Sequence, residues 1–218
     1  ENHYIMTTTT GGAANVLSKL EDYLQTEWPE LDVYLTSVTD HFATISVCGP
    51  NSKKIVSTVI DDLDFSDENF PHMTFKNAKI DKINCRVMRI SFTGELSYEI
   101  NVQANYAKSV WEKCMEAGKD FNITPYGTET MHLLRAEKGF IIVGQDTDGT
   151  MTPVDLQMDW IVSKKKYDFI GKRSLYRSDT IRDDRKQLVG LLTDNPEDVL
   201  EEGSQIVADV KKSPVEML

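Results

Sequence analysis

The clearest hydrophobic pattern in the chain lies in FTGELSYEINV, residues 92–102, where apolar and polar residues alternate after a TGEL turn. Alternation with a period of two is typical of a strand that is buried on one face only. The pattern predicts a β-hairpin whose strands span residues 86–93 and 97–103. Glu99 falls mid-strand on the polar side, where it is either one more charge on a solvated face or a fixed acceptor for the N–H groups of a ligand.

The first 83 residues carry a β-α-β-β-α-β succession of patterns. Leu17, Leu20 and Leu24 recur at helical spacing, and Pro29 then ends that helix. The expected helices span residues 13–27 and 50–59, and the expected strands span residues 3–9, 33–39, 42–47 and 73–80. This order is the split βαβ, or ferredoxin-like, arrangement, in which two helices back an antiparallel sheet.

The rest of the chain predicts a second α+β subdomain followed by strands. Further helices are expected at 106–117, 125–138 and 170–181, and further strands at 187–193 and 205–210. We therefore predict an α+β protein in three parts: a first split-βαβ subdomain at 1–83, a second α+β subdomain at 84–186, and the start of a C-terminal β region at 187–218. The chain opens on Glu1 and closes just after a strand-like run, so we expect a segment of a longer polypeptide.

The composition narrows the range of partners. Hydrophobic residues make up 40% and charged residues 27% of the 218 residues, an ordinary balance for a globular protein. The net charge of −11 argues against nucleic acid, whose phosphates require Lys and Arg, and against an anionic membrane surface. No apolar run approaches the ~20 residues of a membrane span. We therefore expect neither nucleic acid nor a membrane as a partner.

The cysteines and histidines do not have the spacings of a redox or metal site. Cys48, Cys85 and Cys114 are far apart and lack a CxxC spacing, so we expect reduced, buried thiols in a cytoplasmic protein. The four histidines are scattered along the chain. The DTDG stretch at 146–149 lacks the spacing of an EF-hand loop, which predicts an ordered turn and no metal site.

Familiar catalytic and cofactor motifs are missing from the sequence. No GxGxxG follows a strand, and neither a P-loop nor a GxSxG motif occurs. Any catalysis must therefore use carboxylates, hydroxyls and orientation, and no catalytic residue is assigned. Thr7–Thr10, before a Gly-Gly pair, are either plain strand residues or hydroxyls that face a ligand. The basic run Lys164–Lys166 is either a solvated turn or a landing site for an anionic tail.

Four stretches, taken in order, carry a resemblance to a known family. They are TGELSYEI, LRAEKGF, GQDTDGTMTPVD and DFIGKRSL, and they resemble motifs of the folate-binding T-protein family of the glycine cleavage system. The wording TPYGTETMHLLRAEKGFIIVGQDTDGT is similar to a branch of that family, the C-terminal halves of the α subunits of heterotetrameric sarcosine oxidases. The resemblance covers essentially the whole chain.

The resemblance implies a fold and a set of binding residues. The family fold is a group of α+β subdomains around a central cavity that holds tetrahydrofolate. Glu99 matches the family glutamate that grips the amino-pyrimidinone edge of the pterin, which favours the ligand-acceptor interpretation of that residue. Thr7 and Thr8 match a strand end that contacts folate, without a choice between the two. Tyr126 and Arg135 lie near the site by their place in the motifs.

The resemblance also implies a reaction. A flavin, FAD or FMN, in a separate β subunit oxidises sarcosine to an imine, and NAD is expected in an N-terminal half outside this chain. Tetrahydrofolate captures the one-carbon unit, giving 5,10-methylenetetrahydrofolate and glycine. The implied partners are folate, the sarcosine-derived imine and the other sarcosine oxidase subunits. This module contributes orientation, which reaches effective molarities of ~10⁵ M in favourable cases, and no redox chemistry.

Two departures from the T-protein pattern bear on the reaction. The family Asp that assists transfer lies just before the first predicted strand and is not in this chain, and Met131 stands where T-proteins carry an arginine. Met131 favours the oxidase branch over aminomethyl transfer. The alternatives are a stand-alone aminomethyltransferase or T-protein-like methyltransferase, and a non-catalytic scaffold with a folate-binding fold.

Overall fold

The structure is a computed structural model that describes residues 3–207, 209 and 211. The chain forms two compact units, Glu1–Ile141 and Ile142–Leu218. The α-helices are α1 (Ala13–Thr26), α2 (Ser52–Val59), α3 (Ala107–Ala117) and α4 (Thr128–Glu137). The strands are β1 (Phe42–Cys48), β2 (Phe75–Ile80), β3 (Ile83–Met88) and β4 (Ser97–Gln103). Short 3-10 helices lie at Thr10–Gly12, Thr39–His41, Ala104–Tyr106, Lys119–Phe121, Asp159–Ile161 and Lys172–Tyr176.

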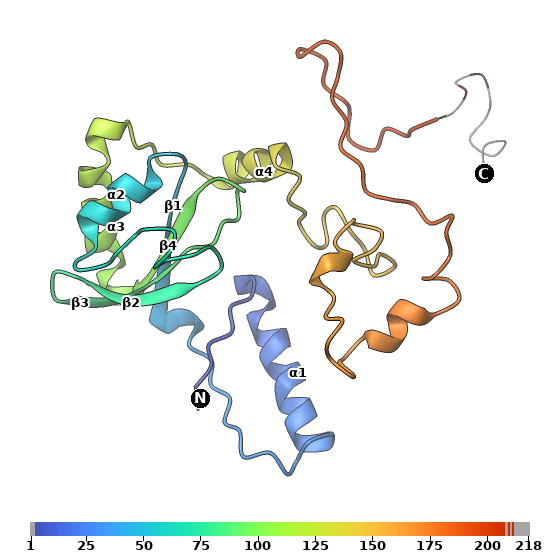
Figure 1. The fold of residues 1–218 in the computed structure, drawn as a ribbon, viewed down its shortest axis with the longest axis horizontal. Helices are drawn as coiled ribbons and strands as arrows, with labels where there is room; N and C mark the ends of the chain where they lie inside the picture. The colour runs from blue at the N-terminus through green and yellow to red at the C-terminus, as the bar shows by residue number, and fades with distance from the viewer. Residues whose placement is uncertain (1–2, 208, 210, 212–218) are drawn as a thin grey trace. The chain divides into compact units, whose positions relative to one another are not determined.

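The strands form one antiparallel sheet in the first unit, in the order β1-β4-β3-β2 (Figure 1). β2 and β3 are consecutive and make a hairpin in which Ile80 pairs with Ile83. β4 pairs along its whole length with β1 on one side, and with the second half of β3 on the other. The predicted hairpin over residues 86–103 is therefore present, with a shorter first strand and a longer connection.

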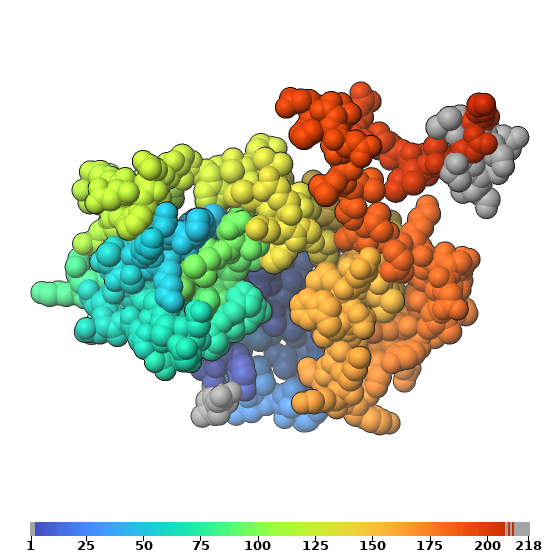
Figure 2. Space-filling view, turned by 45° about the horizontal axis from the view of Figure 1, so that its top comes forward, coloured from blue at the N-terminus to red at the C-terminus, as the bar shows by residue number. Residues whose placement is uncertain are grey.

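Helices α2 and α3 cover one face of the sheet and form the core with it (Figure 1). The alternation in β4 is confirmed, because Tyr98, Ile100 and Val102 are fully buried. The buried helical residues facing them are Ile55, Val56 and Val59 of α2 and Val110 and Cys114 of α3. Figure 2 shows the atoms of these elements, coloured from cyan to lime, as one closely packed group. The intervening, more exposed residues of each strand lie on the opposite face of the sheet, called here the open face.

The TGE turn before β4 packs against the end of α4. Gly94 has a φ of +77°, and a Cβ at this position would lie 2.5 Å from the Cβ of Lys138, so only glycine fits. Lys138 also forms an ion pair with Glu95, with 2.9 Å between Nζ and Oε1. Gly139 follows the helix at a φ of +70°, which lets the chain turn away. Two motifs that are distant in sequence are thereby held together in space.

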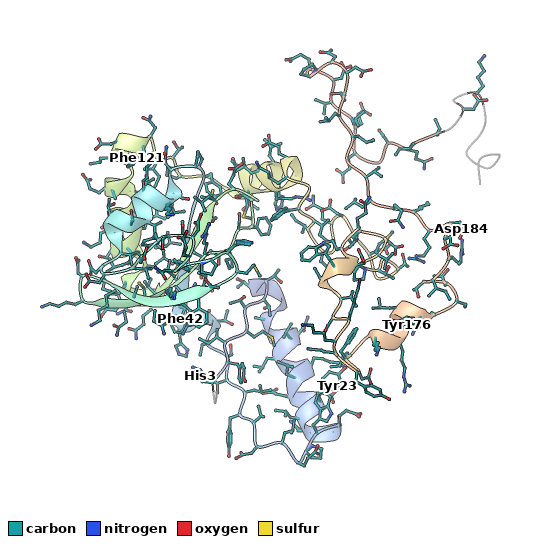
Figure 3. The ribbon with its side chains drawn as sticks, in the orientation of Figure 1. His3, Tyr23, Phe42, Phe121, Tyr176 and Asp184 are labelled. Carbon is teal, nitrogen blue, oxygen red and sulfur yellow. The ribbon has the colours of Figure 1, made fainter. Side chains whose placement is uncertain are left out.

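The second unit has neither α-helix nor strand among its described residues. A cluster of hydrogen-bonded polar and charged side chains connects two of its segments. Asp155, 1% exposed, accepts two hydrogen bonds from Arg185, with Nε at 2.8 Å from Oδ1 and Nη2 at 2.7 Å from Oδ2. Thr152 donates its N–H and its hydroxyl to the same carboxylate, at 2.7 and 3.0 Å. Arg185, foremost among these partners, holds the pKa of Asp155 well below its usual value. The side chains of Tyr176 and Asp184, labelled in Figure 3, are exposed.

The helices predicted in the first unit are confirmed to within three residues at each end, but several other predicted elements are wrong. Residues 3–9, 33–39 and 187–193 lie in no strand, since no described strand pairs with them. The helix predicted at 170–181 is reduced to the 3-10 helix at 172–176. The strand predicted at 205–210 falls partly outside the described residues, and residues 205–207 are not in a strand.

The α+β class and the antiparallel sheet are confirmed, but the helices that cover the sheet are α2 and α3 rather than the predicted pair at 13–27 and 50–59, and the succession of elements differs. The first unit runs α1-β1-α2-β2-β3-β4-α3-α4, whereas the sequence predicts β-α-β-β-α-β over the first 83 residues. Residue 83 begins β3, which pairs with β2 in the same sheet. The division at residues 83 and 186 stays a prediction. Among the described residues, no helix is long and apolar enough to cross a bilayer.

Candidate functional site

Glu99 lies on the open face of the sheet, in the central strand β4. It pairs directly with Ser46 of β1 and with Met88 of β3, so these three side chains share the open face. Partial burial raises the pKa of the Glu99 carboxyl group above its usual value of 4.5. No described residue donates a hydrogen bond to this carboxylate or forms an ion pair with it. The carboxylate is therefore partly desolvated and keeps its acceptor capacity for another molecule.

Tyr126, in the segment that leads into α4, lies beside Glu99 on the β1 side. The thiol of Cys48 donates a hydrogen bond to the Tyr126 hydroxyl, with 3.3 Å between Sγ and the phenol oxygen. Burial, followed by this hydrogen bond and with a smaller contribution from the charge of Glu99, raises the pKa of Tyr126 to about 12. The phenol is therefore neutral at physiological pH. The side chain of Ser46 is a second hydrogen-bond partner of this phenol, and the phenol has one proton of its own to donate.

A pair of serine hydroxyls completes the polar surroundings of Glu99. Ser46 and Ser97 lie in neighbouring strands, and their Oγ atoms are 3.3 Å apart. Ser97 is buried, whereas Ser46 is exposed on the open face. The structure thus brings Glu99 and Tyr126, two of the predicted binding residues, to one place together with Ser46, Ser97 and Cys48.

Among the described residues, no hydrogen bond or ion pair joins Thr7 or Thr8 to this group. They lie in an exposed, irregular segment that precedes the first 3-10 helix, and the Thr8 hydroxyl donates to the neighbouring Thr9 carbonyl at 2.9 Å. The strand end expected there is absent, because residues 3–9 pair with no other strand. Their role toward a ligand stays a prediction.

Arg135 is buried in the last turn of α4, where it supports the local backbone. Its Nη1 donates to the carbonyl of Phe140 at 3.1 Å, and the N–H of Phe140 donates to the Arg135 carbonyl at 2.9 Å. These two bonds fix the exit of the chain from α4, next to the TGE turn that leads into β4. A direct contact of Arg135 with a ligand stays a prediction.

A hollow of about 830 Å³ lies over another part of the open face and does not include Glu99. Its lining includes Asn101 of β4, Arg86 of β3 and Asn77 of β2, one step along the strands from the Glu99 row. Because Glu99 and Tyr126 are outside it, the chemistry of the candidate site is defined by the side chains around Glu99 rather than by this hollow.

The cysteines and the DTDG stretch show no sign of a redox or metal-binding role among the described residues. All three cysteines are free thiols, and burial raises the pKa of Cys85 and of Cys114 to about 11. Cys48 differs from the prediction, since it is only half-buried. In the DTDG stretch, Asp148 accepts from the N–H and hydroxyl of Thr150, as in an ordered turn. Among the described residues, no group of three or more potential metal ligands comes together.

Sequence reasoning missed Ser46, Cys48 and Met88 as neighbours of Glu99. Ser46 and Cys48 alternate with buried Ile45 and Val47, so the period of two does place them on the open face. Which strand lies beside β4, and in which register, depends on pairings between distant segments. That information is not contained in the local pattern.

Comparison with known proteins assigns the chain to a family. The GCVT N-terminal domain family matches residues 1–166, and the chain belongs to this family. The α subunit of sarcosine oxidase from Corynebacterium sp. (strain P-1) is 56% identical over 210 residues, which cover 96% of this chain and 22% of that subunit. The corresponding subunit from Rhizobium meliloti (strain 1021) is 41% identical over 210 residues, 95% of this chain and 21% of the relative.

The aminomethyltransferase branch is more distant. The aminomethyltransferase of Halothermothrix orenii is 37% identical over 143 residues, 64% of this chain and 38% of the enzyme. A solved structure, the heterotetrameric sarcosine oxidase from Corynebacterium sp. U-96 in complex with pyrrole 2-carboxylate, matches 50% of this chain and 54% of that chain, with a TM-score of 0.41 and 16% identity. The resemblance seen in the motifs is confirmed. The chain spans about a fifth of the length of the sarcosine oxidase relatives that it matches.

Proposed function

We propose that this chain is a tetrahydrofolate-binding module, in which Glu99 accepts the N–H groups of the amino-pyrimidinone edge. The observation that carries the proposal is a carboxylate fixed in the central strand, partly desolvated and without a donor among the described residues. Two parallel N–H donors on a planar ring match the two oxygens of such a group. Membership in the GCVT family, which includes aminomethyltransferases, supports folate as the ligand.

The residues around Glu99 suit this ligand chemically. Tyr126 is a neutral phenol with a proton to donate, which fits a carbonyl or ring-nitrogen acceptor on the same heterocycle. Glu99 must be ionised to accept two N–H groups, so its raised pKa makes binding depend on pH. Thr7, Thr8 and Arg135 complete the proposed set of binding residues, and the proposed site is a central cavity formed with further subdomains.

The similarity to sarcosine oxidase α subunits supports a specific reaction. We infer that sarcosine, oxidised by a flavin in another subunit, reaches this module as an imine. Tetrahydrofolate supplies two nucleophilic nitrogens, N5 and N10, that take the methylene group and leave glycine. The role of this chain is to hold the acceptor molecule in one orientation, as part of an assembly with other sarcosine oxidase subunits.

A second candidate function is that of a stand-alone aminomethyltransferase. The similarity to the Halothermothrix orenii enzyme favours it, and Met131 in α4, where T-proteins carry an arginine, weighs against it. Transfer of a one-carbon unit from an aminomethylated lipoyl carrier to tetrahydrofolate by the chain alone would establish this second function.

The proposal is tested by calorimetric titration of the full chain with tetrahydrofolate. Glu99→Gln removes the charge and turns one acceptor into a donor, so we expect an affinity about 10-fold lower or weaker still, since a hydrogen bond to a charged group is worth ~1.5–3 kcal/mol. Glu68→Gln, at an exposed position of the same unit, is the control and should bind like the wild type. Equal affinity of a folded Glu99→Gln variant would rule out Glu99 as the acceptor of the ring N–H groups. Absence of wild-type binding would favour the scaffold alternative.

A further inference from the structure

One row of side chains crosses the open face of the sheet at the level of Glu99. Ser46 of β1 pairs with Glu99 of β4, Glu99 pairs with Met88 of β3, and Met88 pairs with Phe75 of β2. Residues that pair directly in an antiparallel sheet point to the same face. The row therefore reads polar, charged, apolar and aromatic from one edge of the sheet to the other.

The apolar half of the row is open to a molecule from outside. Phe75 is 56% exposed and Met88 is half-buried, although both lie on strands whose other face is packed against the core. The guanidinium of Arg86 lies over the Phe75 ring, 5.3 Å from its centre, in a cation–π contact that leaves the side chain more than half exposed. An exposed aromatic ring beside a thioether is a surface that flat apolar groups contact well.

The polar half of the row is already occupied on the β1 side. Tyr126 lies there, bound to Cys48 and electrostatically linked to Glu99. A planar ring whose donor edge meets Glu99 therefore extends away from Tyr126, over β3 and β2. Neighbouring strands lie about 4.8 Å apart, so the row from Glu99 to Phe75 spans about 10 Å, enough for a bicyclic ring.

We propose that Met88 and Phe75 form the platform on which the body of the reduced pterin ring lies, with its long axis across the strands from β4 toward β2. This orientation rests on the proposed function of Glu99. It places the pyrimidinone edge at Glu99, N5 above Met88 and the substituent that carries N10 at the Phe75 edge of the sheet. Met88 and Phe75 are thus positioning residues, which set where the one-carbon unit is taken up.

The platform is tested by nuclear magnetic resonance of the full chain labelled with ¹³C at the methionine methyl groups. The probe is 6-methyltetrahydropterin, which contains the ring system without the benzoylglutamate tail. We expect the Met88 methyl resonance, assigned with Met88→Leu, to shift on titration, and the Met115 methyl of α3, on the helical side of the sheet, to stay in place. A contact of the ring with Met88 is a readout that a purely structural role would not give.

Affinity measurements with the same probe provide the second arm. Phe75→Ala and Met88→Ala each remove contact area of the size that changes affinity about tenfold. Phe42→Ala is the matched control, because Phe42, labelled in Figure 3, is an exposed aromatic residue on the same face of the sheet in β1, 42% exposed. It should bind the probe like the wild type.

The outcomes separate this proposal from the proposed function. Binding that depends on Glu99, with an unshifted Met88 methyl and no effect of Phe75→Ala, overturns the platform and leaves the folate module standing. Equal losses from Phe42→Ala and Phe75→Ala also overturn it, since the contact would then be non-specific. No binding of either tetrahydrofolate or the probe by the wild-type chain overturns both proposals.

Discussion

The two compact units of the chain are stabilised by different kinds of interaction. All buried hydrophobic residues of the described chain lie between Ile45 and Cys114, in the first unit. Among the described residues of the second unit, the buried ones are Thr152 and Asp155, and large apolar side chains such as Leu192, which is fully exposed, lie at its surface. One unit thus depends on apolar burial, and the other depends on a carboxylate–guanidinium pair.

The difference teaches how each unit should respond to change. An apolar core is a sum of many small contributions, so a single truncation removes a fraction of it. A buried ion pair contributes little net stability when intact but is costly to break, since the remaining charge is left without its partner. In the first unit, the loss of stability should therefore follow how deeply the truncated apolar side chain is buried. In the second unit, the large loss should come from changes to Asp155 or Arg185.

The largest effect is expected for Ile100→Ala, in the centre of β4. Ile100 is fully buried, so its truncation should lower the free energy of unfolding of the first unit by ~3–4 kcal/mol. Ile170→Ala in the second unit, where the side chain is 66% exposed, should change stability by less than ~0.5 kcal/mol. Hydrogen exchange of the β4 amides and urea unfolding measure both. Similar losses for the two variants would contradict the contrast between the units.

A smaller, local effect is expected for Asp155→Asn. The amide keeps the shape of the carboxylate but weakens its hydrogen bonds to Arg185, which retains the exposed Asp179 as an ion-pair partner, at a cost of ~2–3 kcal/mol. The N–H of Leu188 donates to the Asp155 carbonyl at 2.8 Å, and its exchange with deuterium should become faster, while the β4 amides stay protected. Asp183→Asn, at an exposed position, is the control. An unchanged Leu188 amide would show that the pair does not hold the unit.

The smallest expected effect is that of pH on stability, and Asp155 and Glu99 should contribute to it with opposite signs. The folded pKa of Asp155 lies below its usual 3.8, so its contribution is present at neutral pH and is lost as the pH falls below about 4. The folded pKa of Glu99 lies above 4.5, so acidification through that pKa relieves the cost of its charge and stabilises the first unit. The free energy of unfolding, measured as a function of pH for the wild type, Asp155→Asn and Glu99→Gln, separates the contributions of the two carboxyl groups. If both carboxyl groups changed the stability in the same direction on acidification, the expected opposition between Asp155 and Glu99 would be refuted.

The sequence predicted the parts of the fold in which one face of an element is buried. The alternation around Ile100 and the helix expected at 50–59 each reflect contact with one core, and both predictions are confirmed. Residues 3–9 and 33–39 have strand-forming composition, yet they lack a partner strand. Propensity alone does not create a strand, because its hydrogen-bonding groups must be paired.

The candidate site was only partly predictable for the same reason. Glu99 stands out in its own strand, whereas Met88 and Phe75 become its neighbours through the register of the sheet. Arg185 likewise gives no local signal that it binds Asp155, 30 positions earlier in the chain. Features written within one element can be seen in the sequence, and those that arise between elements require the fold.

The order of the strands also sets the order in which the sheet can assemble. β2 and β3 close over a two-residue turn, whereas β1 and β4 bring together Ser46 and Ser97, which are 51 positions apart. Closing the longer loop costs more entropy, so the β2–β3 hairpin is expected to form first, β4 to pair with β3 next, and β1 to join β4 last. The surface around Glu99, which includes Ser46 of β1, is then complete only when this last pairing forms. A molecule bound there should slow unfolding without accelerating folding, so the ligand would increase the kinetic stability of the module.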